Sequence, residues 1–158
     1  MYRFWFATLV LAATATLAVP AAAQTPAKPA GAPRTVDLVA NDEMKYSVTT
    51  IIAKPGEQLR VRVIARGVLP KVAMAHNFVL LKPGTNELKF LEAGAMFRDT
   101  DFIAPAMMGN VLAKTTLAGP GETVQVVFTA PTKPGNYTYL CTFAGHFQAG
   151  MKGVLIVK

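Results

Sequence analysis

Cysteine and histidine are scarce in this chain. Its 158 residues include one cysteine, Cys141, and two histidines, His76 and His146. A single cysteine cannot form a disulfide within the chain, so the fold must be stabilised by its core alone. The lone thiol therefore has another expected use, with metal ligation and catalysis as the leading candidates.

A concentrated basic segment is also missing. The formal net charge is +7, yet the lysines and arginines are scattered and no basic block alternates with aromatic residues. This distribution argues against nucleic-acid binding and indicates long-range attraction to acidic rather than basic partners. No internal repeat is present, and the length suits one domain that buries its own core.

The one long apolar run lies at the N-terminus. It covers residues 4–19 after Arg3 and is followed by small residues up to Ala23, which is typical of a secretory signal peptide over residues 1–23. No cysteine directly follows the run, which excludes a lipid anchor on a cysteine. A retained membrane anchor is the alternative, because the run is near the lower length limit for spanning a bilayer. We expect export to the periplasm, an oxidising space.

Strand patterns fill most of the chain after residues 24–35, a Pro/Ala-rich segment that is expected to be a flexible tether. Apolar and polar residues alternate over 58–65 and again over 123–130, as in a sheet with one solvated face. Further strands are predicted between Pro-Gly turns, at residues 36–40, 46–53, 77–82, 136–141 and 153–158. The pattern predicts an all-β fold, a Greek-key β-sandwich over residues 36–158.

One segment between the predicted strands has helical character. Residues 87–97 are rich in helix formers and predict a short helical flap that ends near residues 98–100. The side chains expected to be buried are Leu88, Leu91 and Ala95, with Phe90 and Phe97 as further candidates.

Three potential metal ligands occur at an even spacing near the C-terminus. Cys141, His146 and Met151 are five residues apart, and one tight loop between adjacent strands could fold them around one ion. A glycine directly precedes the second and the third of them, where such a loop needs unusual backbone angles. A thiolate, two imidazoles and a weak axial methionine form the ligand set of blue-copper sites, and His76 would complete it from a distant strand.

The residues around these ligands carry a family resemblance. The segments NDEMKYS (41–47), LPKVAMAHNFVL (69–80) and CTFAGHFQAGMKGVLIVK (141–158) are similar, in this order, to segments of the azurins and auracyanins of the cupredoxin family. The resemblance implies a Greek-key β-sandwich, one type 1 copper ion that cycles between Cu(I) and Cu(II), and outer-sphere electron transfer. By the same resemblance the strong equatorial ligands are His76, Cys141 and His146, and the axial ligand is Met151.

The resemblance also assigns roles to neighbours of the ligands. Asn77 matches an asparagine that ties the two ligand loops together, and Phe143 matches an aromatic residue packed close to the ligand loop. Ala75 stands where azurins have a glycine whose carbonyl approaches the copper, so a close fifth contact from Ala75 is not expected. Four residues separate His146 from Met151, as in the auracyanins, whereas azurins have three.

A docking surface is implied in the same way, because the ring edge of His146 is expected to emerge through an apolar patch. The predicted patch consists of Met44, Leu69, Ala73, Met74, Ala144 and Phe147, with Met107 and Met108 as further candidates. Redox proteins such as a cytochrome, or a copper reductase or oxidase, are expected to dock there transiently on a monomer.

Two other classes of function would use the same residues differently. A cysteine and a histidine could form a nucleophilic pair, but hydrolysis also needs an orienting group and an oxyanion site, which no motif indicates. A copper chaperone or storage module would present exposed, exchangeable ligands rich in methionine or cysteine. Four protein ligands leave no open position for a substrate, which favours an electron carrier over an enzyme.

Overall fold

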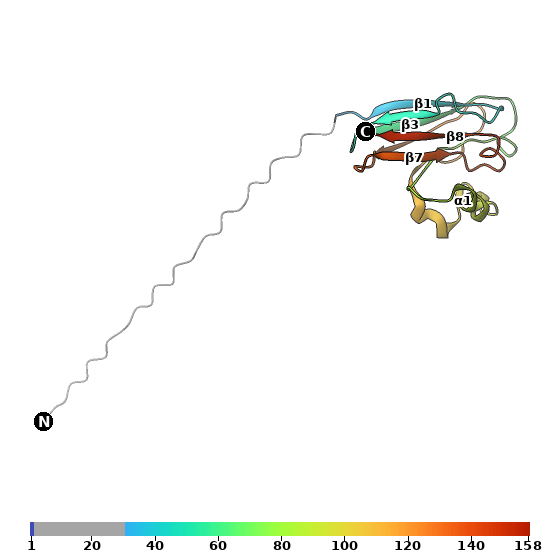
Figure 1. Ribbon diagram of the computed structural model, residues 1–158. Helices are drawn as coiled ribbons and strands as arrows, with labels where there is room; N and C mark the ends of the chain where they lie inside the picture. The colour runs from blue at the N-terminus through green and yellow to red at the C-terminus, as the bar shows by residue number, and fades with distance from the viewer. Residues whose placement is uncertain (2–30) are drawn as a thin grey trace.

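The computed structural model describes residue 1 and residues 31–158, and its strands form two β-sheets that pack against each other (Figure 1). The three-stranded sheet has the order β1 (Arg34–Ala40), β3 (Gln58–Ala65), β6 (Thr123–Thr129). The five-stranded sheet has the order β2 (Thr50–Ala53), β8 (Lys152–Val157), β7 (Gly135–Leu140), β4 (Val79–Leu81), β5 (Val111–Lys114). Neighbouring strands are antiparallel except in the pairs β1–β3 and β2–β8, which are parallel. The predicted all-β sandwich with crossing connections is confirmed.

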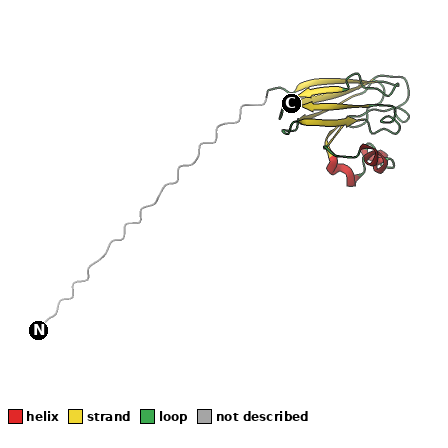
Figure 2. Cartoon of the chain, viewed as in Figure 1, coloured by secondary structure: helices red, strands yellow, loops and turns green. Residues whose placement is uncertain are grey.

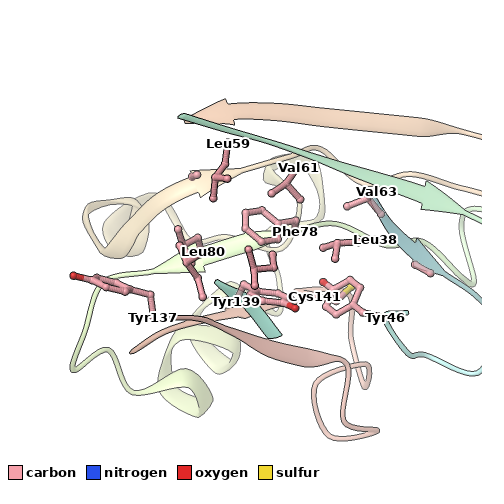
Figure 3. Close-up of a cluster of buried hydrophobic side chains, with 14 of the residues drawn as sticks. Leu38, Tyr46, Leu59, Val61, Val63, Phe78, Leu80, Tyr137, Tyr139 and Cys141 are labelled. Atoms are coloured by element: carbon pink, nitrogen blue, oxygen red, sulfur yellow. The ribbon is translucent and has the colours of Figure 1, made fainter. Parts of the chain in front are cut away.

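The core lies between the two sheets, as the period of the sequence predicts. In β3 the side chains of Leu59, Val61 and Val63 are fully buried, while the alternating arginines are partly exposed. Figure 3 shows these three side chains facing Phe78 and Tyr139 from the opposite sheet. The ring centroids of Phe78 and Tyr139 are 5.2 Å apart, a distance at which aromatic pairs stabilise a core.

The start of the sandwich differs slightly from the predicted boundary at residue 36. β1 begins at Arg34, because Arg34 and Thr35 pair with Leu59 and Arg60 of β3. The predicted signal peptide, residues 1–23, lies outside the described residues apart from Met1, as do residues 24–30 of the predicted tether.

No helix within residues 31–158 is both long enough and apolar enough to cross a membrane.

The two ends of the described domain lie close together. A side-chain nitrogen of Arg34 donates to the carbonyl of Ile52 over 2.7 Å, and the amide of Lys158 donates to the carbonyl of Ala53 over 3.0 Å. Figure 1 shows the C-terminus beside the start of β1, at the end of the sandwich away from the loop that joins β7 to β8.

The helical flap lies outside the sandwich (Figures 1 and 2). It consists of α1 (Glu87–Gly94) and two 3-10 turns, η1 (Arg98–Thr100) and η2 (Pro105–Asn110). The side chain of Asn86 caps α1 by accepting the amide of Lys89 over 3.0 Å.

The flap departs from its prediction in length and in the side chains it buries. The helix ends at Gly94, earlier than the predicted end near residues 98–100. Phe90 is fully buried in a second small core, whereas Leu88 and Phe97 are 52% and 41% exposed. Phe90 and Gly94, the two buried residues of α1, are four positions apart and lie on the same face of the helix. This face packs closely against the neighbouring segment, since a Cβ added at Gly94 would lie 2.0 Å from the carbonyl oxygen of Phe102.

Candidate metal centre

One loop and the segment before β4 bring the predicted ligands together. Cys141 directly follows β7 and Met151 directly precedes β8, and these two strands are neighbours in the five-stranded sheet. His146 lies on the loop between them. His76 comes from the segment before β4, where its backbone exchanges two hydrogen bonds with Ala118, of 2.9 and 2.8 Å.

The loop is held by its own backbone. The amide of His146 donates to the carbonyl of Phe143 over 3.1 Å, the amide of Met151 to the carbonyl of His146 over 2.9 Å, and the amide of Cys141 to the carbonyl of Met151 over 3.2 Å. Gly145 and Gly150 have φ angles of 84° and 94°, which glycine adopts without steric cost. The glycines therefore permit the tight path that returns the chain to Cys141.

The potential ligand atoms of His76, Cys141 and His146 all lie within 4.8 Å of one another, and all three residues are buried. The thiol sulfur is 3.5 Å from Nδ1 of His146. Nδ1 of His76 is buried and has no hydrogen-bond partner in the described part of the chain. A buried imidazole nitrogen left unpaired beside a thiol is costly in a closed core and fits a site completed by a metal ion.

Burial shifts the pKa of each of these groups toward its neutral form. It raises the pKa of the Cys141 thiol to about 12, although the backbone N–H groups of Asn77 and Phe143 act in the opposite direction. It lowers the pKa of His146 to about 4, with a further contribution from His76. It also lowers the pKa of His76, against a raising effect of Asp42. Both imidazoles are thus neutral at neutral pH, the state that ligates a metal.

Met151 lies at the base of the loop and is completely buried. Its backbone amide and carbonyl bond to His146 and Cys141, so its position is tied to two of the other candidate ligands. The structure therefore gathers all four predicted ligand residues at one end of the sandwich.

Asn77 joins the His76 segment to the cysteine loop. Its side-chain nitrogen donates to the hydroxyl of Thr142 over 2.7 Å, and its side-chain oxygen accepts the amide of Thr142 over 2.9 Å. Its backbone carbonyl accepts the hydroxyl of Tyr46. Thr142 and Tyr46 are absent from the sequence prediction; the position of Thr142 directly after Cys141 is the signal that could have indicated it.

The other two predicted neighbours also lie at the site. The carbonyl of Ala75 is 3.9 Å from the sulfur of Cys141, so it faces the cluster. The ring of Phe143 lies 4.8 Å from the ring of His146, centroid to centroid, and the two histidine rings are 5.0 Å apart.

The residues of the predicted docking patch differ in exposure. Leu69, Ala73 and Ala144 are exposed, and Met44 and Phe147 are half-buried. Met74 is a correction: only 8% of it is exposed, because the amides of Ala73 and Met74 bond to the carbonyl of Pro70 in a turn that leaves Met74 inside. The ring of His146 does not emerge, since that residue is only 2% exposed.

Two further apolar residues flank Leu69 on the surface. Val68 and Val72 are 90% and 68% exposed, and their place in the mostly apolar stretch 68–74, which only Lys71 interrupts, could have indicated them. A hollow of about 210 Å³ lies between α1 and the ligand loop. It is lined by residues of both and by Phe102, which follows η1; the others include Leu91, Ala95, Phe143 and Phe147. Met107 is half-buried and Met108 is 42% exposed, both in η2 of the flap.

A buried cysteine between two neutral imidazoles, with a buried methionine on the same loop of a Greek-key sandwich, defines a copper site of the blue-copper type. In agreement with this class, residues 34–158 match the family described as copper binding proteins, plastocyanin/azurin family. The chain belongs to this family, and its cofactor is copper.

Relatives of known type agree. The chain is 36% identical to azurin from Pseudomonas aeruginosa over 126 residues, which cover 78% of this chain and 84% of the relative. It is 33% identical to auracyanin-B from Chloroflexus aurantiacus over 119 residues, which cover 75% of this chain and about half, 49%, of that relative.

Solved structures give the same result. Auracyanin A, described as a "blue" copper protein from the green thermophilic photosynthetic bacterium Chloroflexus aurantiacus, superposes with a TM-score of 0.71 at 30% identity, covering 80% of this chain and 99% of that one. Dithionite-reduced auracyanin from the photosynthetic bacterium Roseiflexus castenholzii gives a TM-score of 0.70 at 29% identity, covering 81% and 99%.

Proposed function

We propose that this protein carries single electrons between redox partners on one copper ion held by His76, Cys141, His146 and Met151. The observation that carries the proposal is the buried convergence of the cysteine sulfur and two imidazoles within 4.8 Å. When bound, the ion would supply one-electron Cu(I)/Cu(II) chemistry, and Met151 would contribute a thioether as its weakest ligand.

The chain's own residues keep the ligands in place. Backbone hydrogen bonds tie Cys141, His146 and Met151 to one another, and Asn77 ties that loop to the segment of His76. Ligands fixed in this way, in a closed core, hold one arrangement through a change of charge, which favours rapid electron exchange. With four protein ligands and no position left for a substrate, the protein is a carrier rather than an enzyme.

Electrons enter and leave on the His146 side of the site. The exposed apolar residues there, Leu69, Ala73 and Ala144, support brief docking of a partner such as a cytochrome or a copper reductase or oxidase. The protein acts as a monomer in the periplasm, to which the signal peptide at residues 1–23 directs it.

The visible and electron-paramagnetic-resonance spectra of the copper-loaded protein test the assignment. We expect an intense visible absorption from thiolate-to-Cu(II) charge transfer, and we expect Cys141→Ser to lose it. A colourless Cu(II) form of the unmodified protein would overturn the proposal. Rapid loss of copper to a chelator would instead indicate a chaperone or storage module.

A further inference from the structure

An aspartate of the flap, Asp101, forms hydrogen bonds to two segments beside the metal centre, one next to Cys141 and one that pairs with His76. Asp101 directly follows η1 and has φ 58° and ψ 35°, and Phe102 after it has φ 58° as well. Left-handed backbone is uncommon outside glycine, least so for aspartate, and two such residues in succession persist only where the surroundings hold them. The amide of Phe102 donates to the carbonyl of Phe97 over 2.8 Å, which closes this turn.

The carboxylate of Asp101 holds the segment that pairs with His76. One oxygen accepts Nζ of Lys114 over 2.8 Å, and the other accepts the amide of Leu117 over 3.1 Å. The next residue, Ala118, exchanges the two backbone hydrogen bonds with His76. The ion pair is mostly withdrawn from solvent, with 18% of the aspartate side chain and 29% of the lysine side chain exposed.

The carbonyl of the same residue holds the cysteine loop. It accepts the hydroxyl of Thr142 over 2.5 Å, and that hydroxyl also accepts the side-chain nitrogen of Asn77. Thr142 is the neighbour of Cys141. The ring of Phe102, next to Asp101, meets the ring of Phe143 edge-on at a centroid distance of 5.3 Å.

We infer that Asp101 is a positioning residue that fixes the cysteine loop against the His76 segment and so tunes the copper centre. This inference rests on the proposed function. With the left-handed backbone at residue 101, the carbonyl accepts a hydrogen bond from Thr142 in the cysteine loop. The carboxylate of the same residue bonds to Leu117, next to the residue that pairs with His76. Removing hydrogen bonds behind the ligands of a metal commonly lowers metal affinity or activity by about 10- to 100-fold, and a residue one step further out is expected at the lower end of this range.

Three variants separate positioning from charge. Asp101→Asn removes the negative charge and so the ion pair with Lys114, and it replaces one of the two acceptor oxygens with a donor. Lys114→Gln removes the positive charge but leaves the carboxylate bond to Leu117. Asp99→Asn is the matched control, because Asp99 is exposed and no hydrogen bond or ion pair to it is found within residues 31–158.

If Asp101 positions the two segments, the variants Asp101→Asn and Lys114→Gln should have the same effect on the copper centre. Asp101→Asn and Lys114→Gln should both change the copper hyperfine splitting in the same direction and both slow electron self-exchange, the first by about tenfold. Asp99→Asn should match the unmodified protein. In the metal-free protein, the amides of Leu117 and Thr142 should exchange hydrogen faster in Asp101→Asn, a measurement that needs no bound copper.

If Asp101 and Lys114 act on the copper centre only through their charges, the result should differ, and it would overturn the inference. Reduction potentials would then shift in opposite directions in Asp101→Asn and Lys114→Gln, with hyperfine splitting, self-exchange and amide exchange unchanged. If Asp101→Asn does not fold, the milder Lys114→Gln decides by the same measurements. If the unmodified protein is not blue, the proposed function fails, while the amide-exchange result still decides whether Asp101 holds the two segments.

Discussion

The two histidines of the metal centre are buried in their neutral form. Burial lowers the pKa of His146 to about 4 and also lowers that of His76. In the unfolded chain both would titrate near an ordinary value of about 6.5. Between about pH 4 and pH 6.5, these two side chains are therefore protonated to a greater extent in the unfolded chain than in the folded one.

We predict that the metal-free protein loses stability as the pH falls from about 6.5 to about 4. In this window the unfolded chain takes up protons that the folded chain does not, so the free energy of unfolding decreases as the pH falls. Carboxylates with lowered pKa values, such as Glu57 beside Arg34, add their losses at lower pH. Thermal unfolding at several pH values between about 7 and 4 measures the effect.

His146→Gln provides the control for this prediction. A glutamine does not titrate, so the metal-free variant should show a shallower loss of stability over the same window. A melting temperature that does not change between about pH 6.5 and pH 4.5 in the unmodified metal-free protein would contradict the prediction.

At the scale of single elements, α1 packs closely against the rest of the flap because Gly94 has no side chain. A Cβ at Gly94 would lie 2.0 Å from the carbonyl oxygen of Phe102 and 2.8 Å from its carbon. These are backbone atoms of a segment that is itself fixed by its left-handed turn, so they cannot move aside cheaply.

We predict that Gly94→Ala destabilises the protein by about 1–3 kcal/mol, although alanine favours a helix over glycine by about 1 kcal/mol. Urea unfolding of the metal-free variant measures the change. Gly109→Ala, in η2, is the matched control, because nothing lies within 4 Å of its added Cβ. Equal stability of the two variants would show that the contact between α1 and Phe102 is not tight.

The elements also show what the sequence predicts and what it does not. β3 was predictable because Leu59, Val61 and Val63 alternate with polar residues over its full length. β5 was missed, because its four residues, Val111–Lys114, show no alternation in a segment that otherwise reads as loop. Periodicity left Phe90 as a further candidate and predicted Leu88 to be buried, but it does not contain the tertiary contact of Gly94 with Phe102, which lies on the face of α1 that carries Phe90.

Some residues of the candidate site could likewise be predicted from the sequence, and others could not. His76, Cys141 and His146 could be named because so few residues of these types exist, and scarcity leaves one combination. The link from Asp101 to Thr142 could not, because it joins residues 41 positions apart and depends on a left-handed backbone that no local pattern indicates.

At the scale of the whole molecule, one group of exposed apolar residues lies on the segment that leads to His76. Leu69, 42% exposed, lies on the segment that leads to His76, with Val68 and Val72 beside it. Ile52, 52% exposed, lies on β2 and pairs with Ile156 near the C-terminus, toward the opposite end.

We predict that Leu69→Lys slows electron self-exchange without changing the visible spectrum, because a charge must be desolvated wherever two such surfaces meet. Ile52→Lys adds the same charge at the far end and should leave the rate unchanged. Nuclear magnetic resonance line broadening in mixtures of the oxidised and reduced protein measures both rates. Equal rates in the two variants would place the exchange surface elsewhere.

The two ends of the described domain lie close together, and this affects how the protein can be attached to a support. Arg34 and Lys158 both contact the segment around Ile52 and Ala53, at the end of the sandwich away from the ligand loop. A linkage made at either of these residues, to an electrode, a surface or a fused domain, leaves the ligand loop facing outward. The residues suited to attachment and the residues of the metal centre thus lie at opposite ends of the sandwich. A domain that is immobilised through Arg34 or Lys158 keeps its copper end accessible to a partner.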